Sequence, residues 1–216
     1  MPLYTADALI LRTYKLGEAD RIVVFLTRDR GKKRGVAKGA RRPRSRFGAA
    51  LEPMTEARVA YFEKERRELV GLNYAEPVRS PMDAPTFDAL GYIGYFAELL
   101  DEWAQEADAD DRLFRLGASM LDALSAGAPV EPLARYFECW LLRLQGVYPE
   151  ARGTLSDEAM AFLAASRTVT PQQVGAVPIS RAVLMELEQV HRALIAMHLE
   201  KNLKSDRVLR DLRKHN

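Results

Sequence analysis

The sequence has little that would support covalent or metal chemistry. It contains one cysteine in 216 residues, so neither an intrachain disulfide nor a cluster of zinc-binding thiolates is expected. The spacings of a P-loop, a GxSxG nucleophile motif and an HExxH zinc motif are also absent. The sequence therefore predicts no catalytic group, metal or cofactor, and we do not expect an enzyme.

Long apolar runs are missing as well. No stretch approaches 18 consecutive apolar residues, so no segment is expected to cross a bilayer. The N-terminal sequence MPLYTADALIL has no cationic region before its apolar residues and does not resemble a signal peptide. Together with the single cysteine, these features predict a cytoplasmic protein with no membrane partner.

Acidic residues are absent from the most distinctive segment, RGKKRGVAKGARRPRSR at 30–46. Its nine cations are Arg30, Lys32, Lys33, Arg34, Lys38, Arg41, Arg42, Arg44 and Arg46. Burial of unpaired charge costs several kcal/mol per ion, so this segment is expected to face solvent or a polyanion. Cations at this density neutralise nucleic-acid phosphates, although a basic loop can also serve only to keep a protein in solution.

The two parts of the chain carry opposite net charges. The first 80 residues hold 18 Lys and Arg against 10 Asp and Glu, a net charge of +8, and the remaining 136 hold 14 against 20, a net charge of −6. This asymmetry predicts a polyanion contact on the first part. Ten acids lie between Asp83 and Asp122, and we expect DNA to avoid their surface. The segment Asp108–Asp111 resembles part of a calcium loop but lacks the later ligands, so it is interpreted as a connection between helices.

Side-chain patterns predict strands in the first 80 residues. Five alternating or β-branched runs, separated by Gly, Asp and Pro, span 9–14, 21–27, 35–38, 51–61 and 68–75. Five short strands are typical of a small barrel or sandwich. The OB-fold, a five-stranded barrel that binds single strands, is one such architecture.

The period changes to helical after Ser80. Apolar residues recur every three or four positions in four stretches, 89–103, 113–124, 133–144 and 183–197. Ser156 and Ser180 are predicted helix N-caps. We therefore expect a multidomain α+β chain, with a five-stranded barrel domain at 1–80 and an α-helical domain at 81–216.

Isolated titratable side chains of the helical part are assigned ordinary roles. His191 and His198 lie seven residues apart on one helix, about 10.5 Å by the helical rise, which is too far to share a metal. Both, and His215, are interpreted as surface or interface histidines. Cys139 lies in the apolar face of its helix and is expected to be a small buried hydrophobe.

Three segments of the chain resemble the RecO family of bacterial DNA-repair proteins. They are LGEADRIVVFLT at 16–27 with VAKGAR at 36–41, RYFECWLLRLQG at 135–146, and HLEKNLKS at 198–205. The resemblance covers nearly the whole chain and keeps the order and spacing of the segments. It implies an N-terminal OB-fold followed by a helical domain.

The same resemblance implies a recombination mediator that makes no covalent bonds. Such a protein binds single- and double-stranded DNA and anneals complementary strands. It works with RecR to help RecA replace the single-strand-binding protein SSB, whose acidic C-terminal tail docks on the helical domain. The expected location is the cytoplasm, in association with the nucleoid.

The resemblance also suggests site residues. By motif match, Lys38 and Arg41 would lie on the DNA-binding face of the barrel. The other cations assigned there, by charge alone, are Lys32, Lys33, Arg34, Arg42, Arg44 and Arg46. Arg135 is a candidate for the SSB tail, because an arginine can pair with a carboxylate beside an apolar groove. Many relatives carry a four-cysteine zinc site after the third helix, but the segment 146–154 has no cysteine, so that module is expected to be missing.

We expect a loop at 31–46 to form a cradle along the DNA backbone, with arginines making bidentate phosphate contacts. Tyr14, Phe47 and Tyr61 are candidates for base stacking, although aromatic residues of a barrel more often belong to its core. Two alternatives stay open. The basic loop and the helical domain could dock acidic protein partners in a non-catalytic scaffold, or the barrel could bind RNA, which a preference for the 2′-hydroxyl would reveal.

Overall fold

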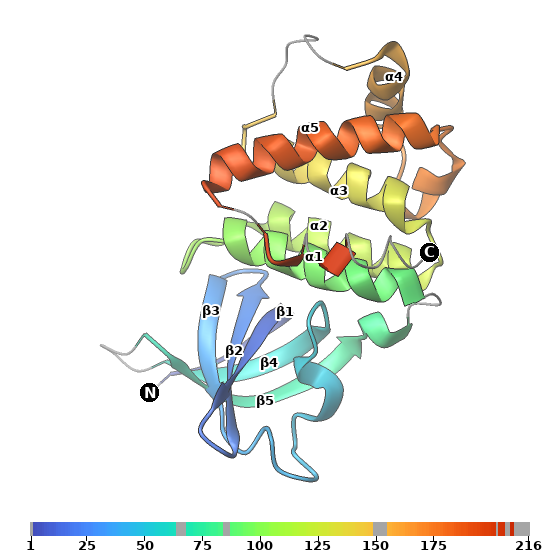
Figure 1. Cartoon of the computed structure of the whole chain (residues 1–216). Helices are drawn as coiled ribbons and strands as arrows, with labels where there is room; N and C mark the ends of the chain where they lie inside the picture. Colours follow the sequence, from blue (N-terminus) through green and yellow to red (C-terminus); the bar gives the residue numbers. More distant parts are fainter. Residues whose placement is uncertain are drawn as a thin grey trace. The chain divides into compact units, whose positions relative to one another are not determined.

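The computed structural model describes residues 2–63, 68–83, 87–148, 155–201, 203–205 and 208–209. Strands occupy the N-terminal part of the chain and helices follow (Figure 1). The chain divides into two compact units. The first comprises Met1–Asp83 with Ile93–Leu121, and the second comprises Ala84–Tyr92 with Asp122–Asn216.

The five strands of the first unit form a closed barrel. They are β1 (Leu3–Leu16), β2 (Asp20–Thr27), β3 (Gly31–Ala37), β4 (Glu56–Phe62) and β5 (Val70–Arg79). Their order around the barrel is β1-β2-β3-β5-β4, and every neighbouring pair is antiparallel except β3 and β5. This closed five-stranded sheet confirms the predicted OB-type fold.

Large apolar side chains fill the barrel because alternate residues of each strand point inward. Ile10, Val23 and Phe25 are fully buried there. The Tyr61 ring packs against the ring of Phe25, with a centroid separation of 5.6 Å. Phe47, which lies in the connection between β3 and β4, is buried in the same core. The connection is thereby anchored at its C-terminal end.

The strands differ from the predicted ones chiefly in β1, β3 and β4. β1 spans Leu3–Leu16 and so extends beyond the predicted 9–14 at both ends. β3 begins at Gly31 instead of Gly35, because the backbone of this basic stretch pairs with β2 through Thr27. Residues Gly48–Leu51 form the 3-10 helix η1, so β4 begins only at Glu56. The β3–β5 pairing covers only Gly35–Ala37.

The first half of β3 finds a different neighbour on the side of β5. The Lys32 N–H donates to the Gln105 carbonyl at 3.0 Å, and the Ala107 N–H donates to the Lys32 carbonyl at 3.4 Å. The connection between α1 (Phe87–Trp103) and α2 (Asp111–Ser125) thus makes a parallel bridge with β3. This bridge lies within the first compact unit.

The first unit extends beyond the predicted boundary at residue 80. The barrel ends there, since β5 stops at Arg79 and the short 3-10 helix η2 (Pro81–Asp83) follows. However, most of α1 and α2 belongs to the same unit as the barrel. A Cβ atom on Gly117 of α2 would lie 2.7 Å from side-chain atoms of both Leu9 and Leu100, so the helix packs closely against β1 and α1.

The second unit contains α3 (Val130–Leu144), α4 (Asp157–Ala165), the 3-10 helix η3 (Pro171–Ala176) and α5 (Arg181–Leu199). α5 packs against α3 and α4. The hydroxyl oxygens of Ser156 and Ser180 accept hydrogen bonds from the backbone N–H groups of Ala159 and Val183. Both predicted N-caps are therefore confirmed. Among the described residues, no helix has the length and apolar character needed to cross a membrane.

Candidate nucleic-acid interface

The structure divides the basic segment into two parts with different environments. Residues 31–37 form strand β3, so the cradle predicted as one loop from 31 to 46 is not a continuous loop. Residues 38–46 lie in the connection between β3 and η1. We call this second part the exposed basic loop.

Two cations of β3 are engaged by acids of the same unit. The Lys32 Nζ donates to the Asp101 backbone carbonyl at 2.6 Å and lies 3.4 Å from its Oδ1. The Lys33 Nζ donates to Glu63 Oε1 at 2.7 Å. Both lysine side chains are only 17% exposed. Each is therefore a weaker candidate for phosphate contact than its charge suggested, whereas Arg34 is exposed and forms no ion pair within the described residues.

Several of the acids after residue 83, whose surface we expect DNA to avoid, lie against cations of the barrel. Asp101 also lies 3.3 Å from Arg12 Nε, and Asp111 lies 3.7 Å from Arg28 Nε. Part of the acidic region thus neutralises cations of the barrel. The connection at Asp108–Asp111 joins two helices as predicted, and Asp110 Oδ1 accepts from the backbone N–H groups of the first turn of α2.

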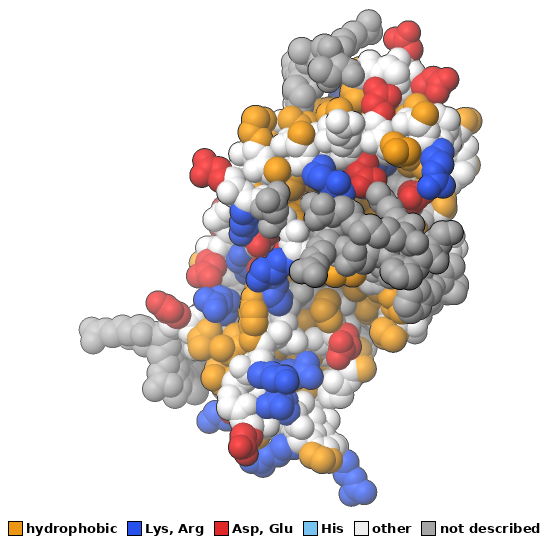
Figure 2. Space-filling view, in the orientation of Figure 1, with side chains coloured by type: hydrophobic (Ala, Val, Ile, Leu, Met, Phe, Trp, Pro, Cys, Tyr) orange, Lys and Arg blue, Asp and Glu red, His pale blue; other side chains and the backbone are white. Residues whose placement is uncertain are grey.

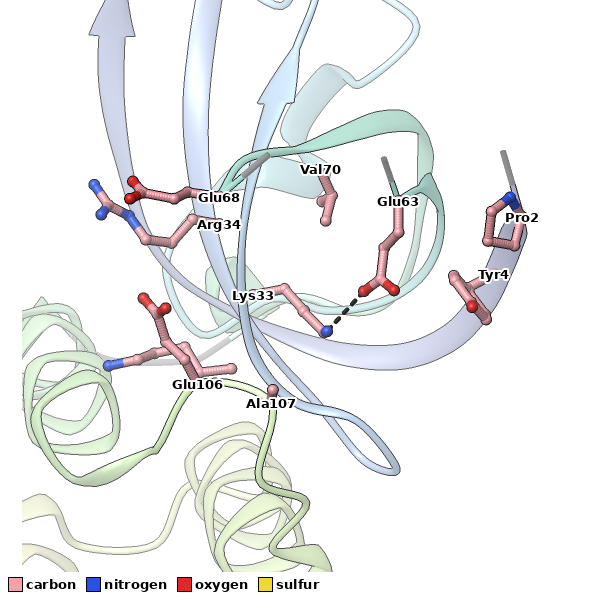
Figure 3. Close-up of a pocket in the computed structure, with 10 residues that line it drawn as sticks. Pro2, Tyr4, Lys33, Arg34, Glu63, Glu68, Val70, Glu106 and Ala107 are labelled. Atoms are coloured by element: carbon pink, nitrogen blue, oxygen red, sulfur yellow. Dashed lines mark hydrogen bonds and ion pairs between the residues drawn. The ribbon is translucent and has the colours of Figure 1, made fainter. Parts of the chain in front are cut away.

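A pocket of about 440 Å³ opens beside β3 (Figure 3). In the close-up, Lys33 points toward Glu63, and Glu68 lies next to Arg34. Three cations (Lys32, Lys33 and Arg34) and three acids (Glu63, Glu68 and Glu106) line the pocket together with apolar residues. Because these formal charges cancel, the pocket offers no net attraction to a polyanion.

The exposed basic loop carries the solvent-facing positive charge. Its cations are all exposed: Lys38, Arg41, Arg42, Arg44 and Arg46. Figure 2 shows Lys and Arg side chains gathered over the barrel. None of these five forms an ion pair within the part of the chain that the structure describes.

Hydrogen bonds fasten this loop to the turn between β1 and β2. The Arg41 backbone N–H donates to the Ala19 carbonyl at 2.9 Å, and Arg41 Nη1 donates to the Gly17 carbonyl at 2.7 Å. The Gly39 N–H donates to Asp20 Oδ1 at 2.8 Å. With the buried Phe47 at its other end, the loop has a fixed backbone and outward cations. This arrangement suits contacts to a phosphate backbone.

The three aromatic candidates for base stacking differ in their exposure to solvent. Phe47 and Tyr61 are buried in the barrel core, so neither offers a ring face to a base. Tyr14 is 43% exposed near the end of β1. Only Tyr14 among the three can therefore contact a ligand from solvent.

Arg135 is not placed to meet the tail of a partner protein. Its residue is 3% exposed, and its guanidinium pairs with Glu138 at 2.8 Å and with Glu188 at 3.3 Å. Two carboxylates of the second unit therefore already engage this guanidinium. Arg135 is therefore a weaker candidate for docking than the sequence suggested, and its role stays a prediction.

The interpretation of His191 as a surface or interface histidine was also wrong. The residue is fully buried, with Nδ1 at 2.9 Å from Glu138 Oε2 and Nε2 at 3.1 Å from the Tyr148 hydroxyl. The sequence could have predicted this burial, because His191 lies midway in the four-residue repeat between Leu187 and Ile195, which are both buried. His198 is exposed, and His215 lies outside the described residues.

Cys139 is fully buried, as predicted. Burial raises the pKa of its thiol to about 11. Within the described residues, no group of three or more His, Cys, Asp or Glu side chains is arranged to hold a metal ion. Most of the segment where the zinc module was expected to be missing, residues 149–154, lies outside the described residues.

Comparison with known proteins identifies relatives of this chain. Two family models match it, Recombination protein O N terminal at residues 1–81 and Recombination protein O C terminal at residues 84–153. The chain is 42% identical over 152 residues to the DNA repair protein RecO of Koribacter versatilis (strain Ellin345), an alignment that covers 68% of this chain and 61% of that protein. It is 42% identical over 144 residues to the protein of the same name from Anaeromyxobacter sp. (strain K), covering 65% and 56%. The chain thus spans less than two thirds of the length of these relatives.

Proposed function

Since the chain belongs to the RecO family of DNA repair proteins, we propose that it is a recombination mediator that binds and anneals single-stranded DNA. In this proposal it also acts with RecR to help RecA replace SSB on single strands. The RecR, RecA and SSB contacts rest on family membership alone. No residue of the second unit is assigned to them, because Arg135 is buried in an ion pair. A mediator with these partners would work at the nucleoid.

The exposed basic loop is the observation that carries the proposal. It presents five cations on a backbone fastened to the β1–β2 turn. Each cation that meets a phosphate releases condensed counterions, so binding gains free energy that depends on salt and not on base sequence. Arginine guanidinium groups add bidentate contacts to phosphate oxygens. Gly39, with a φ of +72°, lets the backbone turn so that the cations face outward.

Annealing follows from the same charge. When the protein neutralises two complementary strands, their mutual repulsion falls and the strands approach each other more often. Base pairing then supplies the free energy, so the proposed activity needs neither ATP nor a covalent step. We accordingly propose a mediator without catalytic residues.

The test is fluorescence anisotropy of a labelled single strand across a series of salt concentrations, with annealing of a complementary pair followed in the same buffers. We expect tight binding at low salt that weakens steeply as salt increases. The Arg→Ala replacement of the four loop arginines, Arg41, Arg42, Arg44 and Arg46, should flatten the slope of log affinity against log salt by about three units.

The matched control is the double variant Lys32→Ala, Lys33→Ala. It also removes cations from the basic segment, but these two are already paired with acids, so the slope should change little. An unchanged slope in the four-arginine variant would contradict the role of the loop. Absence of DNA binding by the wild-type protein would overturn the proposal and favour the scaffold interpretation, and a preference for RNA over DNA of the same sequence would favour an RNA-binding protein.

A further inference from the structure

One face of the barrel carries a cross-strand row that the exposed basic loop does not include. Strand register places Tyr14 opposite Ile22, Ile22 opposite Val36, and Val36 opposite Gly71. Directly paired residues of neighbouring strands lie on the same face of a sheet. These four residues, which we call the Tyr14 row, therefore run side by side across β1, β2, β3 and β5, over about 14 Å at the usual strand spacing.

The Tyr14 row lies on the outer face of the barrel. Tyr14 and Gly71 are exposed, and Ile22 and Val36 are half-buried. A Cβ atom on Gly71 would have no neighbouring atom within 4 Å, so the end of the row on β5 is open. In the next row along the strands, Val23 and Val70 point inward and belong to the core. The outer row is thus a shallow apolar strip with an aromatic ring at one end.

Cations border this strip on the same face. Arg12 and Arg34 lie two residues before Tyr14 and Val36, and residues two apart on a strand share a face. Arg12 Nη1 donates to the Tyr14 hydroxyl at 3.3 Å. Asp101 in turn lies 3.3 Å from Arg12 Nε. This chain of contacts holds the tyrosine ring in place before any ligand arrives.

The strip is also close to the exposed basic loop along the chain and in space. β1 continues from Tyr14 to the turn that receives the hydrogen bonds of Arg41, at Gly17 and Ala19. A ligand whose charged part lies on the loop can therefore place its apolar part on the row. An apolar peptide would match the row but would supply no acceptor for Arg34, whereas a nucleic acid supplies both flat rings and phosphates.

From these observations we propose that the Tyr14 row receives unpaired bases of a single strand whose phosphates lie along the exposed basic loop. The proposal rests on the proposed function, because it assumes that the loop binds a nucleic-acid backbone. Bases stack on aromatic side chains irrespective of sequence. In a duplex the same base faces are already stacked on their neighbours. The row therefore gives preference for single strands, while the loop binds single and double strands alike.

The experiment compares Tyr14→Ala, Tyr14→Phe and wild-type protein. Each is titrated with a single strand that contains the fluorescent base 2-aminopurine and with a duplex of the same sequence. Tyr14→Ala should weaken single-strand binding about 5- to 100-fold and leave duplex binding within about twofold. It should also reduce the quenching of 2-aminopurine on binding. Tyr14→Phe keeps the ring and should behave like the wild type.

The possible results distinguish the proposed role of the Tyr14 row from that of the exposed basic loop. Single-strand affinity that stays within about twofold in Tyr14→Ala, while the four-arginine variant loses affinity, would overturn the row and leave the proposed function standing. Equal losses for single strand and duplex would also overturn it. A loss in Tyr14→Phe as large as in Tyr14→Ala would assign the effect to the hydroxyl bonded by Arg12 and overturn stacking. Failure of the wild-type protein to bind any DNA would instead defeat the proposed function itself.

Discussion

Asp101 holds Lys32 through two of its oxygen atoms, the backbone carbonyl at 2.6 Å and carboxylate Oδ1 at 3.4 Å. The other carboxylate oxygen lies 3.3 Å from Arg12 Nε. One acid of α1 therefore neutralises two cations of the barrel. The positive charge that this side of the barrel offers to DNA is smaller than the sequence suggests.

The first prediction concerns this acid. Asp101→Asn should strengthen single-strand binding at low salt and steepen the slope of log affinity against log salt by up to about one unit. The reason is that Lys32 and Arg12 lose the carboxylate that competes with phosphate. Anisotropy over a salt series measures both effects.

The control for this prediction is Asp108→Asn, which makes the same change of net charge. Asp108 is exposed and forms no ion pair within the described residues. Equal gains from the two variants would show that overall charge, and not the release of Lys32 and Arg12, sets the affinity.

The second prediction concerns Gly31, where β3 begins. Its φ is +66°, and an added Cβ would lie 2.4 Å from the backbone oxygen of Asp108. Gly31→Ala should therefore lower the free energy of unfolding by about 3 kcal/mol or more, through backbone strain and a clash that no side-chain rotation relieves. Urea denaturation measures the loss.

Substitutions at two other glycines distinguish backbone strain from the steric clash as causes of that loss of stability. Gly17 has a φ of +56° but open space around it, so Gly17→Ala should cost only about 1–2 kcal/mol of backbone strain. Gly71 has neither feature, and Gly71→Ala should stay within about 0.5 kcal/mol of the wild type. If Gly31→Ala and Gly17→Ala lower the free energy of unfolding equally, the clash with Asp108 contributes nothing to the loss of stability.

The third prediction concerns the buried network of the second unit. Glu138 accepts a hydrogen bond from Arg135 Nη2 at 2.8 Å and lies 2.9 Å from His191 Nδ1. Glu138→Gln keeps the shape but removes the charge that balances Arg135, so unfolding should become easier by about 2–3 kcal/mol. Glu158→Gln, an exposed acid of α4, should change stability by less than about 0.5 kcal/mol in the same urea assay. Similar effects from both would argue against the network.

The fourth prediction concerns pH. Burial raises the pKa of the Cys139 thiol from 9.0 to about 11. A folded state that holds the proton more tightly than the unfolded state is stabilised fully below pH 9, and this stabilisation is lost as the pH rises toward 11. The free energy of unfolding should fall over that window by an amount on the order of 2 kcal/mol.

Urea titrations at a series of pH values compare the wild type with Cys139→Ala for this purpose. The variant should show a shallower fall between pH 9 and 11. A residual slope is expected, because burial also raises the pKa of Tyr61, to about 12. Identical slopes in the two proteins would contradict the assignment to Cys139.

Much of the fold follows from local patterns. The β-branched and aromatic run around Val23 predicts β2, and the four-residue repeat through Leu187 predicts α5. Ser156 caps its helix through a bond to a residue three positions later. Contacts of this kind lie within one element, so the sequence displays them directly.

Other features depend on residues that are distant in sequence. The first half of β3 holds glycine and lysine, which are poor strand formers, and becomes a strand only because β2 pairs with it. Lys32 meets Asp101 across 69 positions, and His191 meets Glu138 across 53. No local sequence pattern predicts a contact between residues so far apart in the chain. The exposed basic loop could therefore be recognised from charge alone, but the cations that the protein already neutralises could not.

The bridge between Lys32 and the connection of α1 and α2 has one more consequence. The first half of β3 pairs with β2 on one edge but not with β5 on the other. A free strand edge is a template on which another chain can add a strand and start aggregation. On that edge, the Lys32 N–H and carbonyl are already hydrogen-bonded to the backbones of Gln105 and Ala107. The connection between the two helices thus protects the barrel against edge-to-edge association with other copies.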